Sequence, residues 1–108
     1  MSSKYEKSAK FTIGQLIRHK IFDYRGVVID VDPEYAGTDD WYDAVARSKP
    51  PKDAPWYHIL VDSAEARTYV AERNIEADES GRPIDHPDLN DYFRILGNDG
   101  YLPRRKGN

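Results

Sequence analysis

Three histidines are the side chains of this sequence best suited to metal binding or proton transfer near neutral pH. His19, His58 and His86 lie far apart, and none has a second histidine or a carboxylate at the spacing that places two metal ligands on one helix face. His58 alternates with Trp56 and Leu60, so the three would share one face of a strand. We expect each of these histidines to be structural, and His58 to be hydrogen-bonded on its strand face.

The segment DVDPEY, residues 30–35, offers carboxylates at Asp30, Asp32 and Glu34, which resembles the start of a calcium-binding loop. Pro33 interrupts the pattern, and neither the turn glycine nor the closing bidentate glutamate of such a loop falls in register. The sequence also contains no GxSxG elbow, no glycine-rich phosphate loop and no HExxH motif. We therefore predict a protein that is not an enzyme, with no catalytic residue, metal site or cofactor.

Basic and aromatic side chains alternate in RHKIFDYR, residues 18–25. Residues 4–25 carry a local net charge of +4, whereas residues 26–43 hold six acidic residues and no basic one. Basic groups bind phosphates and aromatic rings stack on bases, although a solvated surface also explains such a run. The candidate DNA-contacting residues are Arg18, Lys20, Arg25, Arg104 and Arg105.

Length and composition indicate one soluble domain. The chain has 108 residues, of which 39% are hydrophobic and 32% are charged, with a net charge of −3. It has no cysteine, a polar N-terminus and no run of 18 apolar residues. We expect a cytoplasmic protein without a membrane anchor, made of a flexible tail over residues 1–9 and a domain over residues 10–105.

Four short strands are predicted to build this domain. They span residues 15–20, 27–32, 56–62 and 67–72, and the last two form a hairpin across SAEA. In the second strand, simple alternation places Val27, Ile29 and Val31 on one face. The elements together favour a mainly β fold, a small and strongly bent SH3-like barrel with one long loop and a short C-terminal helix.

The long loop covers residues 33–55 and has no periodicity, although WYDAVAR could form one helical turn. Because long loops of compact domains are often functional, Trp41 and Tyr42 are the candidate partner-contacting residues. Residues 74–86 are expected to be a turn region. An amphipathic helix is expected to follow Pro87, with a cap from Asp85 or His86, and to end at Gly97.

Several of these segments resemble one known family in order and spacing. They are GQLIRH at 14–19, YRGVVIDVDPEY at 24–35, APWYHILV at 54–61, TYVAERNI at 68–75 and HP at 86–87. The chain is similar over about residues 10–105 to the HspQ family, also called YccV-like or hemimethylated-DNA-binding domain proteins. The resemblance implies an SH3-like barrel, a heat-inducible bacterial protein and self-association, with a trimer suspected. The stretch from His86 to the C-terminus departs from the enterobacterial members.

Strand 56–61 poses a packing question, because both of its faces are bulky. Tyr57, Ile59 and Val61 point one way, and Trp56, His58 and Leu60 point the other. The second face must be covered by the long loop and the C-terminal segment, or by a neighbouring subunit of a homo-oligomer. We expect Trp56 and Tyr57 to be structural.

Two functional hypotheses follow from the resemblance and the charge pattern. The first is an adaptor or specificity-enhancing factor for the ATP-dependent Lon protease and its substrates, acting by protein–protein contacts. The second is a regulator that binds hemimethylated DNA near the replication origin and affects the initiator protein. An acidic protein gains little from phosphate contacts unless its basic residues converge on one face, which favours the first hypothesis.

Overall fold

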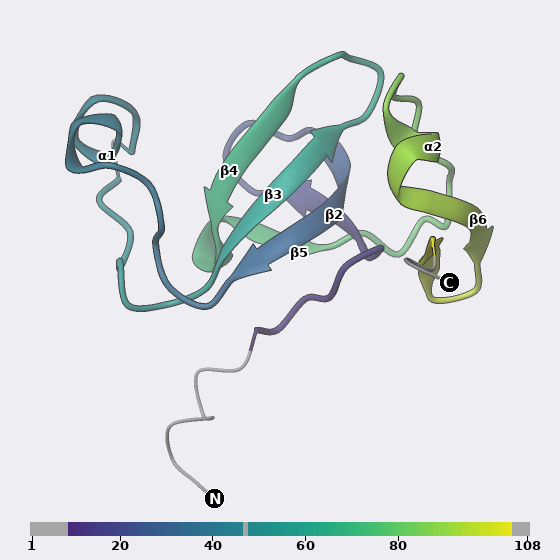
Figure 1. Ribbon diagram of the computed structural model, residues 1–108, viewed down its shortest axis with the longest axis horizontal. Coiled ribbons are helices and arrows are strands. Elements are labelled where there is room, and N and C mark those ends of the chain that lie inside the picture. The colour runs from purple at the N-terminus through teal and green to yellow at the C-terminus, as the bar shows by residue number, and fades with distance from the viewer. Residues whose placement is uncertain (1–8, 47, 105–108) are drawn as a thin grey trace, which may run out of the picture.

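The computed structural model describes residues 9–46 and 48–104, so Arg105 and nearly all of the expected N-terminal tail lie outside the described residues. Five strands form one antiparallel sheet in the order β4-β3-β2-β1-β5 (Figure 1). Their bounds are Leu16–His19 for β1, Arg25–Asp32 for β2, Trp56–Val61 for β3, Arg67–Ala71 for β4 and Ile75–Ala77 for β5. A single 3₁₀ turn, η2 (Glu72–Asn74), connects β4 to β5.

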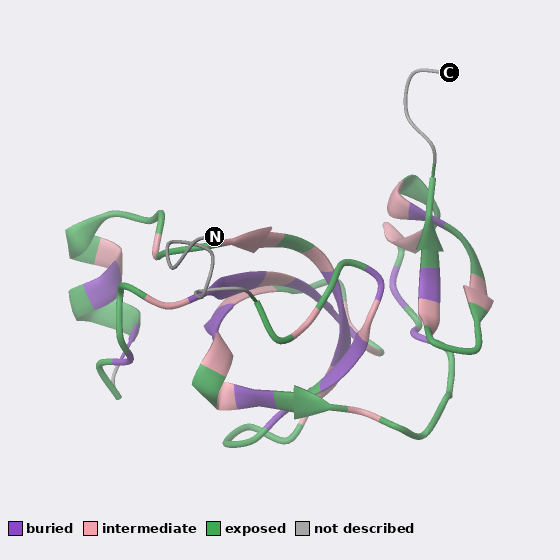
Figure 2. Cartoon of the chain, turned by 90° about the horizontal axis from the view of Figure 1, so that it is seen from below, coloured by how far each residue is buried: buried purple, intermediate pink, exposed green. Residues whose placement is uncertain are grey.

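The sheet curls strongly around an apolar interior, as Figure 2 shows. Close approach of β2 and β3 needs a glycine, because a Cβ on Gly26 would lie 2.5 Å from Ile59 Cγ2 and 2.6 Å from the Leu60 carbonyl oxygen. The predicted fold class, a small and strongly bent β domain, is confirmed. The described strands do not close into a ring, since β4 and β5 each have one neighbouring strand.

A β-bulge changes the faces of β2 relative to the sequence prediction. The pairing with β3 shifts by one residue between Val28 and Asp30, so Ile29 has no direct partner. Val28 and Val31 pack inside the curl, whereas Val27 and Ile29 pack on the outer face. The expectation that Val27, Ile29 and Val31 share one face is therefore wrong, because strict alternation does not hold across a bulge.

Three apolar clusters surround the sheet. The inner cluster, inside the curl, contains Ile17, Val28, Tyr57, Ile59, Val70 and Ile75. The C-terminal cluster contains Leu16, Val27, Leu60, Ile84, Phe93 and Tyr101. The loop cluster contains Tyr42, Ala46, Trp56 and Ala71, with Tyr35, Trp41 and Tyr69 packed against it.

These clusters explain why both faces of β3 are bulky. Tyr57 and Ile59 fill the inner cluster, while Trp56 belongs to the loop cluster and Leu60 to the C-terminal cluster. The long loop and the C-terminal segment therefore cover the outer face within one chain. Trp56 and Tyr57 are both buried, as their predicted structural role requires.

The long loop contains a helix, α1 (Asp39–Val45), at one end of the molecule, and the C-terminal elements lie at the other end (Figure 1). These C-terminal elements are a four-residue helix, α2 (Leu89–Tyr92), and a hairpin of β6 (Phe93–Gly97) and β7 (Gly100–Pro103). Among the described residues, no helix is long and apolar enough to cross a membrane.

The prediction of one helix up to Gly97 is wrong. Phe93 to Gly97 pair with Gly100 to Pro103, and Phe93 and Tyr101 pack together at 5.4 Å in the C-terminal cluster. The expected cap from Asp85 or His86 is also wrong, because the N-cap residue of α2 is Asp88, which makes no side-chain capping hydrogen bond; its N–H donates to His86 Nδ1. Residues 75–77, expected to be part of a turn region, form β5 instead.

Candidate functional site

The outer edge of β4 has unpaired backbone groups. Val61 N–H donates to the Ala66 carbonyl and Glu72 N–H donates to the Pro55 carbonyl, at 3.1 and 3.0 Å. In an antiparallel pair the hydrogen-bonded positions alternate, so the N–H and C=O of Thr68 and Val70 face β3. Those of Arg67 and Tyr69 face away from β3, where no strand of the described chain lies beside them.

A groove of about 1280 Å³ runs along this edge, and we call it the edge groove. One of its lips is the β1–β2 turn with Ile21 and Phe22, and the other is α1 with Trp41 and Val45. Ile21, Phe22 and Val45 are 59%, 74% and 53% exposed, which is high for large apolar side chains. Three of the six large apolar side chains that the described structure exposes therefore line one groove.

The β1–β2 turn is held by His19. Its ring is buried, and Nδ1 accepts hydrogen bonds of 3.1 Å from the N–H groups of both Ile21 and Phe22. An imidazole nitrogen that accepts must be unprotonated, and burial lowers the pKa of His19. The neutral ring thus fixes the backbone that presents Ile21 and Phe22.

The α1 lip is held by a cap at one end and an anchor on its inner side. The Trp41 N–H donates to Oγ1 of Thr38, the N-cap residue, and the buried Tyr42 donates its hydroxyl to the Pro50 carbonyl at 2.6 Å. Trp41 packs against Tyr35 and Tyr69 and lines the groove. Of the two predicted partner-contacting residues, Trp41 therefore lies on the groove wall, whereas Tyr42 lies beneath it.

A cluster of polar side chains, Asp32, His58 and Tyr69, lies on the outer face of the sheet between the loop cluster and the C-terminal cluster. Asp32 Oδ2 lies 3.0 Å from His58 Nε2 and accepts the Tyr69 hydroxyl at 2.7 Å, and the Tyr69 oxygen also accepts the Ala36 N–H. Burial and the bond to Asp32 both raise the pKa of Tyr69, so its hydroxyl stays a donor. These contacts tie the end of β2 and the start of the long loop to β4.

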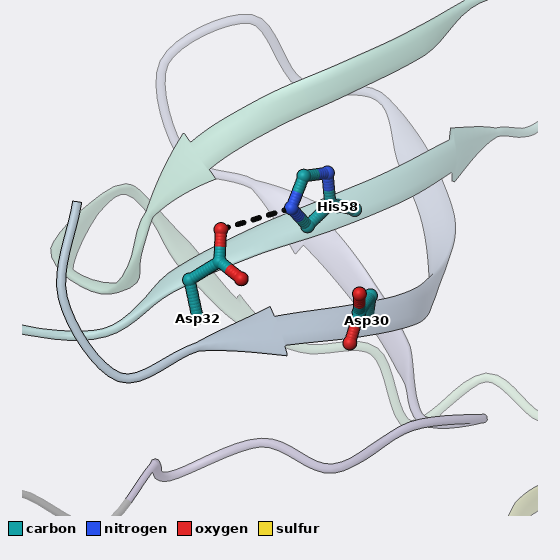
Figure 3. A group of neighbouring side chains, drawn as sticks. All are labelled: Asp30, Asp32 and His58. Atoms are coloured by element: carbon teal, nitrogen blue, oxygen red, sulfur yellow. Dashed lines mark hydrogen bonds and ion pairs between the residues drawn. The ribbon is translucent and has the colours of Figure 1, made fainter. Parts of the chain in front are cut away.

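The same region holds the only described group of three side chains with metal-ligand atoms close together. Ligand atoms of Asp30, Asp32 and His58 lie within 4.8 Å of one another (Figure 3). Asp32 and His58 are bonded to each other, and Asp30 Oδ1 accepts the Val31 N–H. Hydrogen bonds account for this arrangement, and we assign no metal to it.

Of the four described candidates for DNA contact, Arg18, Lys20 and Arg25 lie on or beside the β1–β2 turn, and Arg104 lies in the C-terminal segment. Arg25 forms ion pairs with Asp62 and Asp78 at 3.0 and 2.9 Å and donates to the Arg82 carbonyl. Arg18 forms an ion pair with Asp23 on the β1–β2 turn.

Of the others, Lys20 is exposed beside the β1–β2 turn. Arg104 donates to the Asn90 carbonyl in the C-terminal segment, at the other end of the molecule. Arg18 and Arg25 pair across neighbouring strands close to Lys20, and both arginines are matched by carboxylates.

Sequence reasoning missed Ile21 and Val45 as surface residues. The apolar pair Ile21-Phe22 inside an otherwise polar turn could have indicated a binding surface, because large apolar side chains are unusual in a solvent-exposed turn. Val45 and the free edge of β4 gave no such signal, since they depend on the positions of α1 and of the neighbouring strands.

Comparison with protein families gives a match to the family described as "Hemimethylated DNA-binding protein YccV like", over residues 9–99. This range includes all five strands of the sheet, both lips of the edge groove and the whole of β6. The chain belongs to the YccV-like family.

Proposed function

We propose that this protein is a protein-binding module that acts as an adaptor or specificity-enhancing factor for an ATP-dependent protease of the Lon type. The observation that carries the proposal is the convergence of Ile21, Phe22 and Val45 on one groove, because exposed apolar side chains gathered at one place on a surface are typical of protein interfaces. The ion pairs of Arg18 and Arg25 support the same conclusion, since they engage two of the candidate DNA contacts with carboxylates of the same chain.

A reconstituted degradation assay tests the proposal. A Lon-type protease, ATP and a fluorescently labelled unfolded substrate are combined with the full chain, which should increase the rate of substrate loss. Phe22→Ser should abolish most of the increase. Ile95→Ser is the matched control, because Ile95 is 58% exposed on β6 and does not line the groove. Equal stimulation by both variants would contradict a role of the groove, and no stimulation by the parent chain would refute the adaptor function.

Binding of hemimethylated DNA is the second candidate, and the family description is the observation that favours it. In this acidic chain, such binding would rest on a few exposed basic groups such as Lys20, so it should be weak and electrostatic. Affinity for hemimethylated and unmethylated duplexes should fall steeply from low to physiological salt. A preference for the hemimethylated duplex that stays high and flat over this range would contradict the electrostatic account.

Self-association is also part of the proposal, but the structure removes one of the two arguments for it that the sequence offered. The outer face of β3 is covered within one chain, so that strand does not require a neighbouring subunit. The remaining support is the resemblance to a family for which self-association is expected. Sedimentation equilibrium at micromolar concentration tests it, and a monomer at all loadings would refute it.

A further inference from the structure

Beyond the general protein-binding role, the edge groove has features that select one kind of occupant. Three properties meet there: unpaired backbone groups on β4, apolar side chains on two separate lips, and acidic side chains on the wall and rim. We propose that the groove binds an extended segment of another polypeptide, apolar in its centre and basic at its end, which adds as a strand to β4. This inference rests on the proposed function and specifies how the partner is held.

The backbone of β4 sets the conformation of the bound segment. Arg67 and Tyr69 each present an N–H and a C=O outward, which makes four hydrogen-bonding groups along three residues. An extended chain satisfies such a row, because a neighbouring strand repeats its own donors and acceptors at the same spacing. A folded partner surface or a DNA duplex does not offer this repeat.

The two lips set the side chains of the segment. Alternate residues of an added strand point to opposite faces of the sheet. On β4 itself, Val70 points into the inner cluster and Tyr69 points outward to the loop cluster. The β1–β2 turn lies on the side of Thr68, where the Tyr24 hydroxyl is 2.7 Å from Thr68 Oγ1, and α1 lies on the side of Tyr69. Successive apolar residues of the segment would thus meet Phe22 on one side and Val45 on the other.

The charges near the groove set the ends of the segment. The lining holds Asp32 and Arg67, and an ion pair with Asp88 offsets the charge of Arg67. The exposed Asp40 lies one helical turn before Ala44, which also lines the groove. The stretch from 26 to 43 that includes both residues has six acidic residues and no basic one. A lysine or arginine at the end of the segment complements this charge, whereas a phosphate backbone would be repelled.

The probe is a fluorescein-labelled peptide with four central β-branched residues and a lysine at each end. Its affinity for the full chain is measured by fluorescence anisotropy at physiological salt. A peptide with glutamate in place of both lysines should bind at least about fivefold more weakly if the charge assignment is right. A peptide N-methylated at alternate amides, which keeps every side chain but removes backbone donors, should lose most of its binding.

Variants of the chain separate backbone contacts from side-chain contacts. The Arg67 N–H faces away from β3, and proline is tolerated at the first residue of a strand, so Arg67→Pro removes one outward donor without breaking the β3–β4 ladder. Arg67→Ala is its control, since it removes the same side chain and its ion pair with Asp88. Arg67→Pro should bind the lysine-ended peptide about three- to tenfold more weakly than Arg67→Ala. Phe22→Ser should weaken binding, and Ile95→Ser should not.

The outcomes distinguish this inference from the proposed function. In one outcome, Phe22→Ser abolishes protease stimulation, but neither N-methylation of the peptide nor Arg67→Pro changes peptide binding. This result overturns strand addition and leaves the adaptor function in place. Peptide binding as expected without any protease stimulation refutes the adaptor function and supports the binding mode. If Phe22→Ser instead dissociates an oligomer of the parent chain, the groove is occupied by a second copy and the inference is overturned. Thermal melting of every variant shows that the fold is retained.

Discussion

Arg25→Met is the substitution that most directly separates a structural from a DNA-binding role, because Arg25 was a candidate DNA contact and lies within a network of carboxylates. Its side chain is 12% exposed, and those of Asp62 and Asp78 are 19% and 11% exposed. Methionine keeps most of the aliphatic volume but removes three guanidinium contacts, to Asp62, Asp78 and the Arg82 carbonyl. Two mostly buried carboxylates would then lose their counter-charge.

The expected cost follows from this geometry. Two unit charges about 4 Å apart attract by about 4 kcal/mol at an effective dielectric constant of about 20, and desolvation offsets part of this attraction. Removing one partner of a buried pair costs about 3–5 kcal/mol, and the residual exposure of this network favours the lower end, about 3 kcal/mol. In a domain of this size each kcal/mol lowers the melting temperature by about 4–8 °C. Arg25→Met should therefore melt at least about 12 °C below the parent.

Circular dichroism during heating and urea unfolding measures the effect, with Arg18→Met as the matched control. Arg18 is the cross-strand partner of Arg25, but its ion pair with Asp23 has side chains that are 49% and 67% exposed. Loss of a pair this exposed should leave the melting temperature almost unchanged. An Arg25→Met variant that melts like the parent but no longer binds DNA would refute the reasoning and return Arg25 to the list of DNA contacts.

The pH dependence of Arg25→Met provides an internal check. Burial raises the pKa of Asp78, but hydrogen bonds from Arg25 and Ser80 and the charge of Arg25 outweigh it, so the pKa lies below its usual range. A carboxyl group with a lowered folded-state pKa contributes stability above its unfolded-state pKa and loses it as the pH falls through the folded-state value. The difference in unfolding free energy between parent and variant should accordingly shrink on acidification below about pH 4.

Three further predictions concern the core, the C-terminal contact and the groove. Trp56→Ala should cost about 3–5 kcal/mol in urea unfolding, because the ring is buried, whereas Trp41→Ala should cost clearly less and weaken protease stimulation; a larger loss for Trp41 would make it a core residue. Gly14→Ala should destabilise the chain far more than Gly81→Ala, since both glycines have positive φ but only at Gly14 would a Cβ collide with the Tyr101 carbonyl oxygen; equal melting temperatures would contradict this. Burial favours the neutral form of His19, so the stability that this ring supports is lost as the pH falls from its unfolded-state pKa towards its lower folded-state pKa. NMR titration should show a lowered His19 pKa, and amide exchange at Ile21 and Phe22 should become faster in acid. A His19 pKa at or above the usual value would contradict this prediction.

Most of the sheet could be predicted from the sequence, because β1 to β4 have local apolar patterns and SAEA is a short polar connection between two of them. The bulge at Ile29 could not, since it depends on how β2 pairs with β3. The C-terminal hairpin was mistaken for a helix because Leu89, Tyr92, Phe93 and Leu96 match helical spacing by coincidence. The Asn98-Asp99 turn, followed by Gly100 and set between two apolar pairs, was the stronger signal.

The candidate site was predicted only in part. Trp41 could be predicted to contact a partner, because a tryptophan in a long polar loop is unusual. The structure places Trp41 on the wall of the edge groove. The groove as a whole could not be anticipated, since it joins segments from β1 to α1 to β4 that are separated by tens of residues. The basic residues were predicted to contact DNA because Arg18 and Arg25 are close in sequence to other basic groups. In the structure both arginines form ion pairs with carboxylates, which the sequence alone does not reveal.

The contact between Gly14 and the C-terminal hairpin has a consequence for folding during synthesis. The Tyr101 N–H donates to the Gly14 carbonyl at 2.7 Å, and Phe93 and Tyr101 complete the C-terminal cluster over Leu16, Val27 and Leu60. A ribosome releases the N-terminal strands first, so these three side chains stay open to water until residues 93–101 leave the exit tunnel. Closure by the C-terminal hairpin therefore comes after synthesis of the whole five-stranded sheet.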